Sequence, residues 1–539
     1  MTTGSPDPPT DMPAPPLLTA EAMRAADRYT IEEYGLPGFT LMESAGRGCA
    51  EAIRSAYGPL DGEAVVVLCG KGNNGGDGLV VARRLVGAGA RVHVVLAGAP
   101  EGLSGDSARN LDLLRQLRDE GVGDRLTVEP LDTLGALAET ASRLAPRLYV
   151  DARLGTCLTS ALLEPIRGLV EWVNDRPAPA VAIDVPTGLH SDTGAVLGAA
   201  VRADRTVTMA APKVGLHVGE GPSRAGAVSV VDIGIPAFVL DRAARRPGCA
   251  RRTTDAAVRA WWPARAPDAY KYSVGTAMVV GGSRRFVGAP TMASSAATRS
   301  GAGYVTCACP EPVQPTLAGA LPAVPTLPLP TTDDGLAPDA AATVLEERAD
   351  ALLVGPGLGR GADTRRFVLR LLEAADGPVV IDADGLNALA DTEADWTAHA
   401  DDRWVLTPHA GEFRRLAGDE VDLTDRVRTA QTYAQEWGVV LLLKGQPSVV
   451  AGPDGRTYVG GTGTPALATA GTGDVLAGQC VGFLAQGLDP VEAAAAALHL
   501  GGAAARRYVA TRDARTLTAP DLVDELPRAT RERLDPEAP

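Results

Sequence analysis

The segment Gly70–Gly78 combines the residue types of a nucleotide site with groups that could do acid–base chemistry. It reads GKGNNGGDG, and its five glycines let the backbone approach a bound group closely. If a helix starts within it, the first free N–H groups and the helix dipole would suit a phosphate. Two asparagines and one aspartate add oxygen ligands and a candidate acid or base. The segment therefore predicts a nucleotide site with further chemistry built into it.

The sequence on either side places this segment at a turn from a strand to a helix. Ala64–Cys69 is a continuous apolar run, as in a strand buried on both faces, and residues 79–90 carry apolar side chains at helical spacing. The turn also matches the GxGxxG fingerprint of redox Rossmann domains, which requires an acidic residue at the end of the next strand. That strand, 91–96, runs into Ala97-Gly98-Ala99-Pro100 without a carboxylate, so a hydride-transfer site is disfavoured. A purely structural glycine turn is the other alternative, and its two asparagines and aspartate argue against it.

The composition excludes several classes of partner. The chain has 539 residues and a formal net charge of −15, with no cluster of Lys and Arg, so neither a nucleic acid nor an anionic membrane is expected as the main partner. No run of about 18 apolar residues predicts a membrane span. The N-terminal residues lack the apolar core of a signal peptide. The seven scattered cysteines are expected to be free thiols in a reducing cytoplasm.

Two series of alternating helices and apolar strands divide the chain. Residues 18–240 and 253–528 each predict an α/β domain, and the first is expected to be a Rossmann-like, doubly wound parallel sheet. Residues 241–252 are charged, contain Pro and Gly, and are interpreted as a linker. Residues 1–17 are expected to be a disordered tail, and 529–539 a polar tail. The strands predicted in the first domain are 64–69, 91–96, 147–150, 180–185, 205–209 and 227–232. Those predicted in the second are 276–280, 303–309, 351–354, 378–381, 404–406 and 439–443.

Polar side chains follow further strands of the first domain, where α/β sheets bind ligands. Asp151 ends one strand, Asp184 ends the next, and Lys213-Val214-Gly215-Leu216 follows a third. Together with Asn74, the carboxylates would form an oxygen-rich pocket, and hard cations prefer oxygen ligands. The small number of charges would suit a monovalent ion. The alternative for each aspartate alone is a helix cap or a turn.

Taken together, these motifs resemble the NAD(P)H-hydrate epimerase family. The resemblance covers most of the first domain and rests on NNGGD at 73–77, Asp151-x-x-x-Gly155-Thr156 and Asp184-Val185-Pro186-Thr187-Gly188. It implies that Asp184 contacts the hydrated nicotinamide and is the catalytic acid or base. It also implies a potassium ion bound by Asn74, Asp151 and Thr187. Cys157 stands where the family usually has glycine, which bears on the conformation of its loop. The substrate-binding residues implied are Asn73, Asn74, Gly75, Gly76, Asp77, Gly155, Thr156, Cys157, Leu158, Thr159, Ser160, Ala161 and Asp184.

The second domain carries a glycine turn at the start of an apolar helix. The turn reads Ala470-Gly471-Thr472-Gly473-Asp474, and its backbone N–H groups could form an anion hole for a transferring phosphoryl group. Asp474 would be placed to take a proton from a hydroxyl. A lone His409 is more often structural, but its place between Pro408 and Gly411 at a strand end favours a ligand role. The other polar clusters that follow strands are 281–283, 355–359, 382–387, 407–412 and 444–448.

These clusters resemble the ribokinase-type fold, and more closely the ADP-dependent NAD(P)H-hydrate dehydratase family. Small-molecule kinases share the Gly-Thr-Gly-Asp element, so the motifs at 382–389 and 407–412 decide between the two. The resemblance implies that Asp474 is catalytic. Gln446-Pro447-Ser448 departs mildly from the family pattern. The hydrate contacts implied are Ala289, Gly357, His409 and Asp474. The nucleotide contacts implied are Lys444, Gly445, Gln446, Pro447, Ser448 and Gly473.

The two resemblances together imply bifunctional repair of hydrated NADH and NADPH. One domain would interconvert the R and S hydrates. The other would dehydrate the S form at the expense of ADP, with Mg²⁺ at the nucleotide. A cytoplasmic homo-oligomer without nucleic-acid or membrane partners is expected. Two other classes stay open: a small-molecule kinase with a regulatory first domain, and a non-catalytic binding module, which the acidic charge and Asp184 disfavour.

Overall fold

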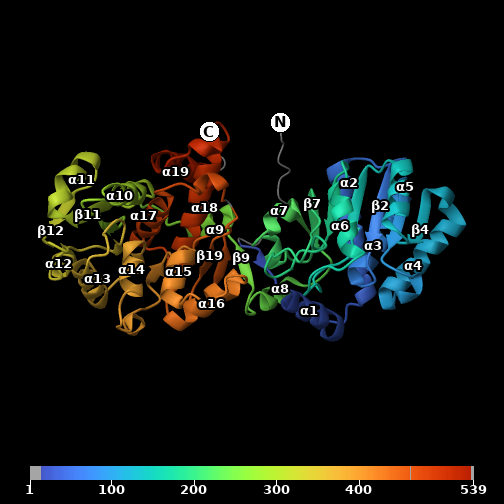
Figure 1. The fold of residues 1–539 in the computed structure, drawn as a ribbon, viewed down its shortest axis with the longest axis horizontal. Helices are drawn as coiled ribbons and strands as arrows, with labels where there is room; N and C mark the ends of the chain where they lie inside the picture. The colour runs from blue at the N-terminus through green and yellow to red at the C-terminus, as the bar shows by residue number, and fades with distance from the viewer. Residues whose placement is uncertain (1–13, 462, 536–539) are drawn as a thin grey trace. The chain divides into compact units, whose positions relative to one another are not determined.

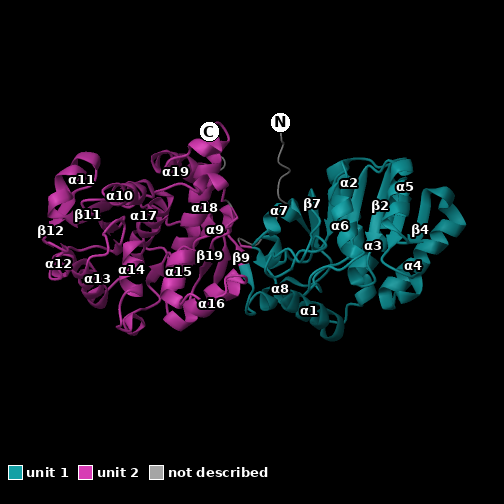
Figure 2. Cartoon of the chain, in the orientation of Figure 1, with its two compact units in different colours: residues 1–11, 15–250 teal, residues 12–14, 251–539 magenta. Residues whose placement is uncertain are grey.

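The computed structural model describes residues 14–461 and 463–535, which form two compact units (Figure 2). Of these residues, unit 1 comprises 15–250, and unit 2 comprises 251–535 together with Ala14. Each unit has its own main sheet covered by helices, and each is described separately below.

A seven-stranded parallel sheet forms the centre of unit 1 (Figure 1). Its order is β4-β3-β2-β5-β6-β7-β8, and every neighbouring pair is parallel. The chain moves outward from β2 to β3 and β4, then crosses to β5 on the other side of β2. The direction of winding therefore reverses between β2 and β5. The strands are β2 (Ala64–Cys69), β3 (Arg91–Leu96), β4 (Leu126–Pro130), β5 (Leu148–Ala152), β6 (Ala180–Ile183), β7 (Arg205–Met209) and β8 (Ala227–Val231).

Helices cover both faces of this sheet because side chains on both faces of the strands are apolar. Val65 and Val67 of β2 join the core under α1 to α4 and α8, while Val66 and Leu68 join the core under α5 and α6. The doubly wound sheet predicted for the first domain is thus present. The helices are α1 (Ala20–Arg28), α2 (Gly38–Tyr57), α3 (Asn73–Gly87), α4 (Gly105–Leu117), α5 (Leu134–Leu144), α6 (Ile166–Asn174), α7 (Gly221–Ala225) and α8 (Ala237–Ala243).

Unit 2 is built on a longer, mixed sheet. The order is β9-β20-β19-β18-β17-β16-β15-β10-β11-β12, parallel except where β19 pairs antiparallel with β18 and β20. Its winding reverses between β10 and β15. The strands are β9 (Ala250–Arg252), β10 (Thr276–Val280), β11 (Tyr304–Pro310), β12 (Thr326–Leu329), β15 (Ala351–Val354), β16 (Val379–Ile381), β17 (Trp404–Leu406), β18 (Val440–Leu443), β19 (Val449–Ala451) and β20 (Thr457–Val459), and β13 (Thr331–Thr332) pairs apart with β14 (Gly335–Leu336).

Helix α17 lies against this sheet and is buried from Val475 to Ala485 except for Leu476. Its crossing with α10 is close: a Cβ on Gly478 would lie 2.2 Å from the Ala293 carbonyl oxygen, so only glycine fits there. The helices of the unit are α9 (Asp255–Trp261), α10 (Gly288–Arg299), α11 (Gln314–Ala320), α12 (Ala340–Glu346), α13 (Ala362–Ala374), α14 (Asp384–Ala390), α15 (Ala410–Ala417), α16 (Arg426–Trp437), α17 (Thr472–Ala485), α18 (Pro490–Val509) and α19 (Ala519–Leu534).

The two expected tails are shorter than predicted. Residues 1–13 lie outside the described residues, but Pro16–Leu17 form strand β1 and both are buried. At the other end α19 continues to Leu534, so residues 529–534 are helical, and Ala529 is buried because the helix keeps an apolar face. The predicted linker, 241–252, contains the end of α8 and the strand β9, and the two units divide after Ala250. Among the described residues no helix is both long and apolar enough to cross a membrane.

Candidate active sites

The predicted site residues of unit 1 lie where the sheet changes its winding direction. The Gly70–Gly78 segment follows β2 and Asp151 lies near the end of β5, the two strands on either side of that reversal. In open α/β sheets this crevice beyond the carboxyl ends of the strands is where ligands bind. The site is therefore placed by topology as well as by residue type.

The glycine turn after β2 is held very close to its neighbours. A Cβ on Gly70 would lie 1.9 Å from the Arg153 carbonyl oxygen, and a Cβ on Gly75 would lie 2.0 Å from the Gly70 carbonyl oxygen. Helix α3 begins at Asn73, and no side chain caps its N-terminus. Its first N–H groups are thus left available for an anionic group.

Two of the three predicted ion ligands, Asp151 and Thr187, are hydrogen-bonded to each other. The Thr187 hydroxyl donates to Asp151 Oδ1 at 2.7 Å, and the Thr187 N–H donates to Asp151 Oδ2 at 2.8 Å. Gly155 packs on the Asn74 side chain, since a Cβ there would lie 3.6 Å from Asn74 Oδ1. Both polar atoms of the Asn74 amide are buried and have no hydrogen-bond partner among the described residues. A buried amide oxygen without a protein partner is available as a ligand for a cation.

Asp184 is fixed by a buried lysine. Its main chain has a left-handed conformation, with φ of 68°, which is costly for a residue other than glycine. Lys213 Nζ donates to Asp184 Oδ1 at 2.5 Å, and the Thr208 hydroxyl donates to the same oxygen at 3.1 Å. The Lys213 side chain is 1 % exposed and that of Asp184 12 %. The geometry holds one carboxylate oxygen in place and leaves the other without a protein donor among the described residues.

Two more carboxyl groups share this environment. Burial raises the pKa of Asp77 well above its ordinary value, and the nearby Asp184 and Asp27 carboxylates raise it further. Burial also raises the pKa of Asp27 to about 6, against the opposing effect of Lys213. The site can thus hold carboxyl groups in different protonation states, the pattern found in acid–base catalysis.

The loop 155–161, predicted to bind substrate, is largely exposed next to this site. Cys157 is exposed and is not among the residues with positive φ. The loop therefore accepts a Cβ at Cys157, although the related family usually has glycine there. Ser191 donates from its hydroxyl to the Thr156 carbonyl at 3.5 Å and ties the loop to the segment after β6.

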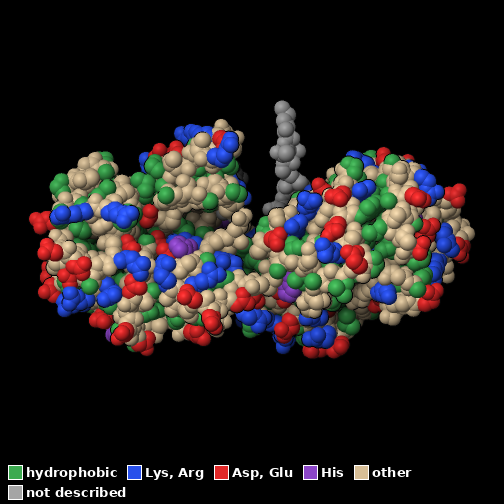
Figure 3. Space-filling view, viewed as in Figure 1, with side chains coloured by type: hydrophobic (Ala, Val, Ile, Leu, Met, Phe, Trp, Pro, Cys, Tyr) green, Lys and Arg blue, Asp and Glu red, His purple; other side chains and the backbone are tan. Residues whose placement is uncertain are grey.

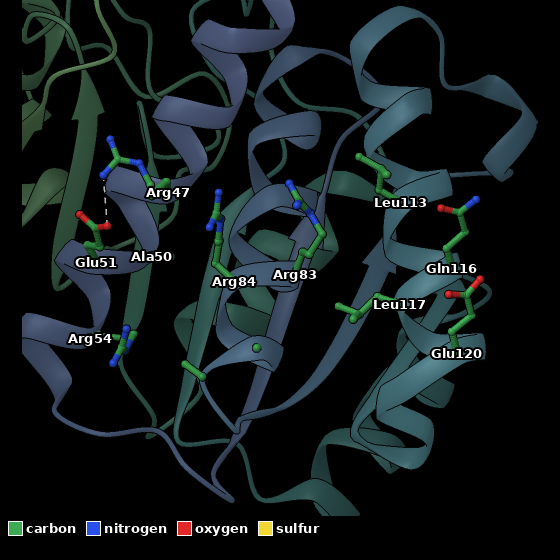
Figure 4. Close-up of a pocket in the computed structure, with 12 residues that line it drawn as sticks. Arg47, Ala50, Glu51, Arg54, Arg83, Arg84, Leu113, Gln116, Leu117 and Glu120 are labelled. Carbon is green, nitrogen blue, oxygen red and sulfur yellow. Dashed lines mark hydrogen bonds and ion pairs between the residues drawn. The ribbon is translucent and has the colours of Figure 1, made fainter.

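A separate pocket of unit 1 contains none of the predicted site residues (Figure 4). It lies among α2, α3, α4 and the turn after α4. Its charged side chains pair locally: Arg47 with Glu51 at 3.2 Å, and both Arg83 and Arg84 with Glu43. These pairs account for much of its charge. Acidic and basic side chains are likewise interspersed on the face in Figure 3, without a continuous basic surface.

Two of the four predicted hydrate contacts of unit 2, Ala289 and Gly357, also lie at a reversal of winding, between β10 and β15. Gly357 follows β15 and has positive φ, and a Cβ there would lie 3.3 Å from the Ala289 Cβ. The same Cβ would lie 2.8 Å from the Phe286 Cβ. Gly357 and Ala289 are thus neighbours, as a shared ligand contact requires, and the half-exposed Phe286 ring stands beside them.

Lys444 is the centre of a buried charge cluster at the ends of β16, β17 and β18. Its ammonium donates to Asp382 Oδ1 at 2.8 Å and lies 3.9 Å from Glu412 Oε2. Burial alone would lower the pKa of Lys444, but these carboxylates raise it above its ordinary value. A Cβ on Gly473 would lie 3.6 Å from Lys444 Nζ, so the glycine turn of α17 reaches the same cluster.

Asp474 enters this cluster from the first turn of α17. Its pKa is raised to about 7, mainly by burial and then by the Asp382 carboxylate, against the opposing effect of Lys444. A base that titrates near neutral pH is suited to taking a proton from a hydroxyl. The Thr472 hydroxyl donates to the carbonyls of Leu467 and Thr469, both at 2.9 Å, and thereby fixes the turn.

His409 and the loop 444–448 follow the carboxyl ends of β17 and β18, which are neighbours in the sheet. His409 Nδ1 accepts from the N–H groups of Gly411 and Glu412 and caps α15, while its Nε2 lies 3.5 Å from Glu412 Oε1. The loop is closed by Ser448, whose hydroxyl donates to the Gly445 carbonyl at 3.1 Å. The predicted nucleotide residues and His409 are therefore neighbours: the Lys444 N–H donates to the Pro408 carbonyl at 2.8 Å.

Known proteins match this arrangement over nearly the whole chain. A family model for the YjeF-related protein N-terminus matches residues 38–215, and one for NAD(P)H-hydrate dehydratase matches 277–528. A bifunctional NAD(P)H-hydrate repair enzyme of Salinibacter ruber is 70 % identical over 524 residues, 96 % of this chain and 97 % of its own. The chain belongs to the bifunctional NAD(P)H-hydrate repair enzyme family. The Moorella thermoacetica enzyme of that name is 41 % identical over 522 residues, 96 % of each chain.

Solved structures also resemble part of this repair-enzyme family member. One of them is an ADP/ATP-dependent NAD(P)H-hydrate dehydratase from Bacillus subtilis, co-crystallised with ATP and Mg²⁺. It is 33 % identical, with a TM-score of 0.46, and covers 52 % of this chain and 98 % of its own. The family and the two-domain α/β fold predicted from the sequence, Rossmann-like and then ribokinase-like, are confirmed.

Several charged side chains near the two predicted sites of this repair-enzyme family member were not predicted to have a role. Lys213 follows a predicted strand, but that position alone predicts no role for it. Asp27 lies in α1, far from the glycine turn in the sequence, so no motif points to it. Asp382 and Glu412 lie in the predicted clusters 382–387 and 407–412, but the sequence predicted no role for either residue. The sequence contains one signal for the lysines, their scarcity: the chain has four lysines and 47 arginines. In the structure two of these four, Lys213 and Lys444, each pair with a buried carboxylate.

The donor atoms in both units fit the ions expected for the family. Within the described residues no group of three or more His, Cys, Asp or Glu is arranged to hold a metal. In unit 1 the donor set is an amide, a hydroxyl and one carboxylate, which suits a monovalent cation. In unit 2 the Asp382 and Glu412 carboxylates lie beside Lys444, a predicted nucleotide contact, and carboxylates are protein ligands that Mg²⁺ accepts beside phosphates.

Proposed function

We propose that unit 1 interconverts the R and S forms of NADH hydrate and NADPH hydrate, with Asp184 as the acid–base group. The hydrate carries a hydroxyl at C6, and inversion there requires a proton to be taken and returned. The Asp184 carboxylate, which Lys213 and Thr208 hold directly after β6, supports this role. The free N–H groups at the start of α3 would bind the pyrophosphate of the substrate.

Asn74, Asp151 and Thr187 would bind a potassium ion in the same unit. The support is the buried Asn74 amide without a partner, next to a carboxylate already oriented by Thr187. Such an ion would attract phosphate oxygens of the substrate. The residues 73–77 and 155–161 would surround that substrate.

Unit 2 would dehydrate the S form at the expense of ADP. Water leaves poorly from C6, so its oxygen is first phosphorylated: Asp474 takes the hydroxyl proton, the oxygen attacks the terminal phosphoryl group, and AMP departs. The ring nitrogen then expels phosphate, and loss of a proton from the adjacent carbon restores NAD(P)H. The observation that carries this function is Asp474, with a pKa near 7, beside the glycine turn and Lys444.

The remaining assignments follow from the family. Ala289, Gly357 and His409 would contact the hydrate, and Lys444 to Ser448 with Gly473 would contact ADP, whose Mg²⁺ neutralises phosphate charge. We also assign a domain boundary within residues 241–252, a cytoplasmic location and a homo-oligomer. Free cysteines throughout, six of the seven buried, agree with a reducing compartment. Light scattering of the purified chain tests the oligomeric state.

A repair assay on the separate epimers tests both activities. S-hydrate with ADP should regain the absorbance of reduced nicotinamide in the absence of potassium, whereas R-hydrate should need an active unit 1 as well. Asp184→Asn should remove use of the R form only, and Asp474→Asn should remove dehydration only. Phosphorylation of another small molecule, with no recovery from hydrate, would instead identify a kinase.

A further inference from the structure

Lys71 lies in the glycine turn after β2, and its side chain reaches the turn that follows β3. A Cβ on Gly98 would lie 2.8 Å from Lys71 Cε and 3.1 Å from its Nζ, and a Cβ on Gly102 would lie 3.7 Å from the same Nζ. The two turns are joined at their base, because the Ala97 N–H donates to the Cys69 carbonyl at 2.8 Å. The Lys71 ammonium is therefore placed directly beyond the carboxyl end of β3.

This ammonium is exposed and is not neutralised by a carboxylate of the chain. Among the described residues Lys71 has neither an ion pair nor a side-chain hydrogen bond. Glu101 is the one carboxylate of the turn 97–102, and it is exposed as well. Asp106, the next acidic residue, points toward the start of α2, since a Cβ on Gly38 would lie 3.2 Å from its Oδ2. The three donors of the Lys71 ammonium are thus available to an anion from outside the chain.

The order of the strands gives the direction in which the substrate extends across unit 1. Asp184 directly follows β6 and the start of α3 follows β2, whereas β3 lies on the other side of β2 from β5 and β6. With the hydrated ring at Asp184 and the pyrophosphate at the start of α3, the adenosine half extends over the end of β3. In dinucleotide-binding α/β domains a carboxylate at this strand end binds the ribose 2′-hydroxyl of NAD, and a basic group accommodates the 2′-phosphate of NADP.

We propose that Lys71 binds the 2′-phosphate of NADPH hydrate, so that unit 1 epimerises NADPH hydrate in preference to NADH hydrate. This inference rests on the proposed epimerase function and adds the choice between its two substrates. A phosphate monoester carries about 1.5 to 2 negative charges at pH 7 and accepts hydrogen bonds at three oxygens. A compact ammonium binds such a group strongly, whereas the neutral 2′-hydroxyl of NADH hydrate gains little from it.

Glycines bring Lys71 close to this strand end. Gly98 has φ of 133°, a conformation that favours glycine, and neither Gly98 nor Gly102 has a side chain to separate the lysine stem from the main chain of the turn. Lys71 Cδ would lie 3.7 Å from a Cβ on Gly102, so the stem runs along the turn. A stem that already lies along the turn loses less conformational freedom when the ammonium binds a phosphate.

The first test measures the substrate preference of unit 1 alone. R-NADPH hydrate and R-NADH hydrate are incubated without ADP, so that unit 2 consumes neither, and the R and S forms are separated by chromatography. We expect a higher kcat/KM for NADPH hydrate in wild type, and a preference lower by about tenfold or more in Lys71→Met, the value of a hydrogen bond to a charged group. Lys71→Arg keeps the charge and should keep most of the preference. Lys271→Met, an exposed lysine of unit 2, should leave it unchanged.

Two results of this test would overturn the proposal. One is an equal kcat/KM of wild type for both hydrates. The other is the same fractional loss for both hydrates in Lys71→Met, which would show a lysine that binds the pyrophosphate or only supports the turn. A wild type that prefers NADH hydrate, and loses that preference in Glu101→Gln, would assign the ribose to Glu101 instead.

The second test measures binding and needs no turnover. Adenosine 2′,5′-bisphosphate and AMP differ only in the 2′-phosphate, and calorimetry gives the affinity of each for wild type and Lys71→Met. Lys71→Met should weaken binding of the bisphosphate by about tenfold and that of AMP far less. Binding to unit 2 is common to both proteins and cancels in the comparison. Equal affinities of the two proteins for the bisphosphate would overturn the proposal. A wild type that shows the binding difference but epimerises neither hydrate would instead refute the proposed function.

Discussion

Lys444 Nζ lies 2.8 Å from Asp382 Oδ1, and this pair sets the charge around Asp474 in unit 2. Asp382 is almost wholly buried and raises the pKa of Asp474, while Lys444 lowers it. With Asp384 and Glu412 also nearby, carboxyl groups outnumber the one lysine. The site is thus poised to hold a proton that Asp474 can release or take near neutral pH.

The rate of dehydration should therefore rise with pH through the pKa of Asp474. A base works only when ionised, and burial places this pKa at about 7. We expect kcat/KM for S-hydrate to increase between pH 6 and pH 8 and then level off. Asp474→Asn should lower it by about 10²–10⁴-fold. Asp184→Asn is the matched control in unit 1 and should leave this profile intact. A flat profile in wild type would contradict Asp474 as the base.

The same raised pKa makes a prediction for stability. A folded-state pKa of about 7 lies above the ordinary value of 3.8, so protonated Asp474 stabilises the fold fully below pH 3.8, and this contribution is lost as pH rises through 7. Asp474→Asn cannot ionise, so its melting temperature without nucleotide should exceed that of wild type at pH 8. At pH 4 the two should agree. Scanning calorimetry checks this, and an equal difference at both pH values would refute the linkage.

Potassium should stabilise unit 1 through Asn74. A ligand that binds only the native state adds RT ln(1 + [K⁺]/Kd), about 2.7 kcal/mol at 100 times Kd. We expect the melting temperature to be higher in potassium chloride than in choline chloride at the same ionic strength. Asn74→Ala should abolish that difference and lower epimerisation. Asn73→Ala is the adjacent control, because Asn73 is exposed and is not one of the proposed ion ligands. A potassium effect that survives Asn74→Ala would place the ion elsewhere.

The glycine turn after β2 offers a pair of matched substitutions. Gly70→Ala would place a Cβ 1.9 Å from the Arg153 carbonyl oxygen, whereas a Cβ on Gly72 meets nothing within 4 Å. Gly70→Ala should destabilise unit 1 by about 1–3 kcal/mol or more through overpacking and abolish epimerisation. Gly72→Ala should be nearly neutral. S-hydrate dehydration measured in both variants reports the integrity of unit 2. Similar behaviour of the two variants would contradict the close approach described for this turn.

The sequence predicted the interior of both sheets well. Strands such as Ala64–Cys69 and Arg205–Met209 have the bounds expected, because a strand buried on both faces must be a short apolar run. Strand β4 was missed because it is an edge strand with exposed, polar side chains. β19 (Val449–Ala451) and β20 (Thr457–Val459) were missed because they form an antiparallel continuation of the sheet after β18, whereas the sequence pattern was interpreted as strands alternating with helices.

In unit 1, site residues within contiguous sequence motifs could be predicted. Contacts between charged residues far apart in the sequence could not. Of the three predicted ion ligands, Asp151 and Thr187 are hydrogen-bonded to each other, and Asn74 packs against Gly155; their binding of an ion stays a prediction. The contact between Lys213 and Asp184 joins residues 29 positions apart, and no periodicity in the sequence requires it. The influence of Asp27 depends on how α1 packs, which local patterns do not determine.

The scarcity of lysine gives the protein a simple pattern of chemical reactivity. Lys213 and Lys444 are engaged in buried ion pairs, so among the lysines only Lys71 and Lys271 present an accessible primary amine. Apart from the N-terminal amine, a mild succinimidyl ester dye should therefore attach at one known side chain in each unit. Lys71 and Lys271 could therefore be labelled with a fluorescent dye, one in each unit, without introducing any engineered residue.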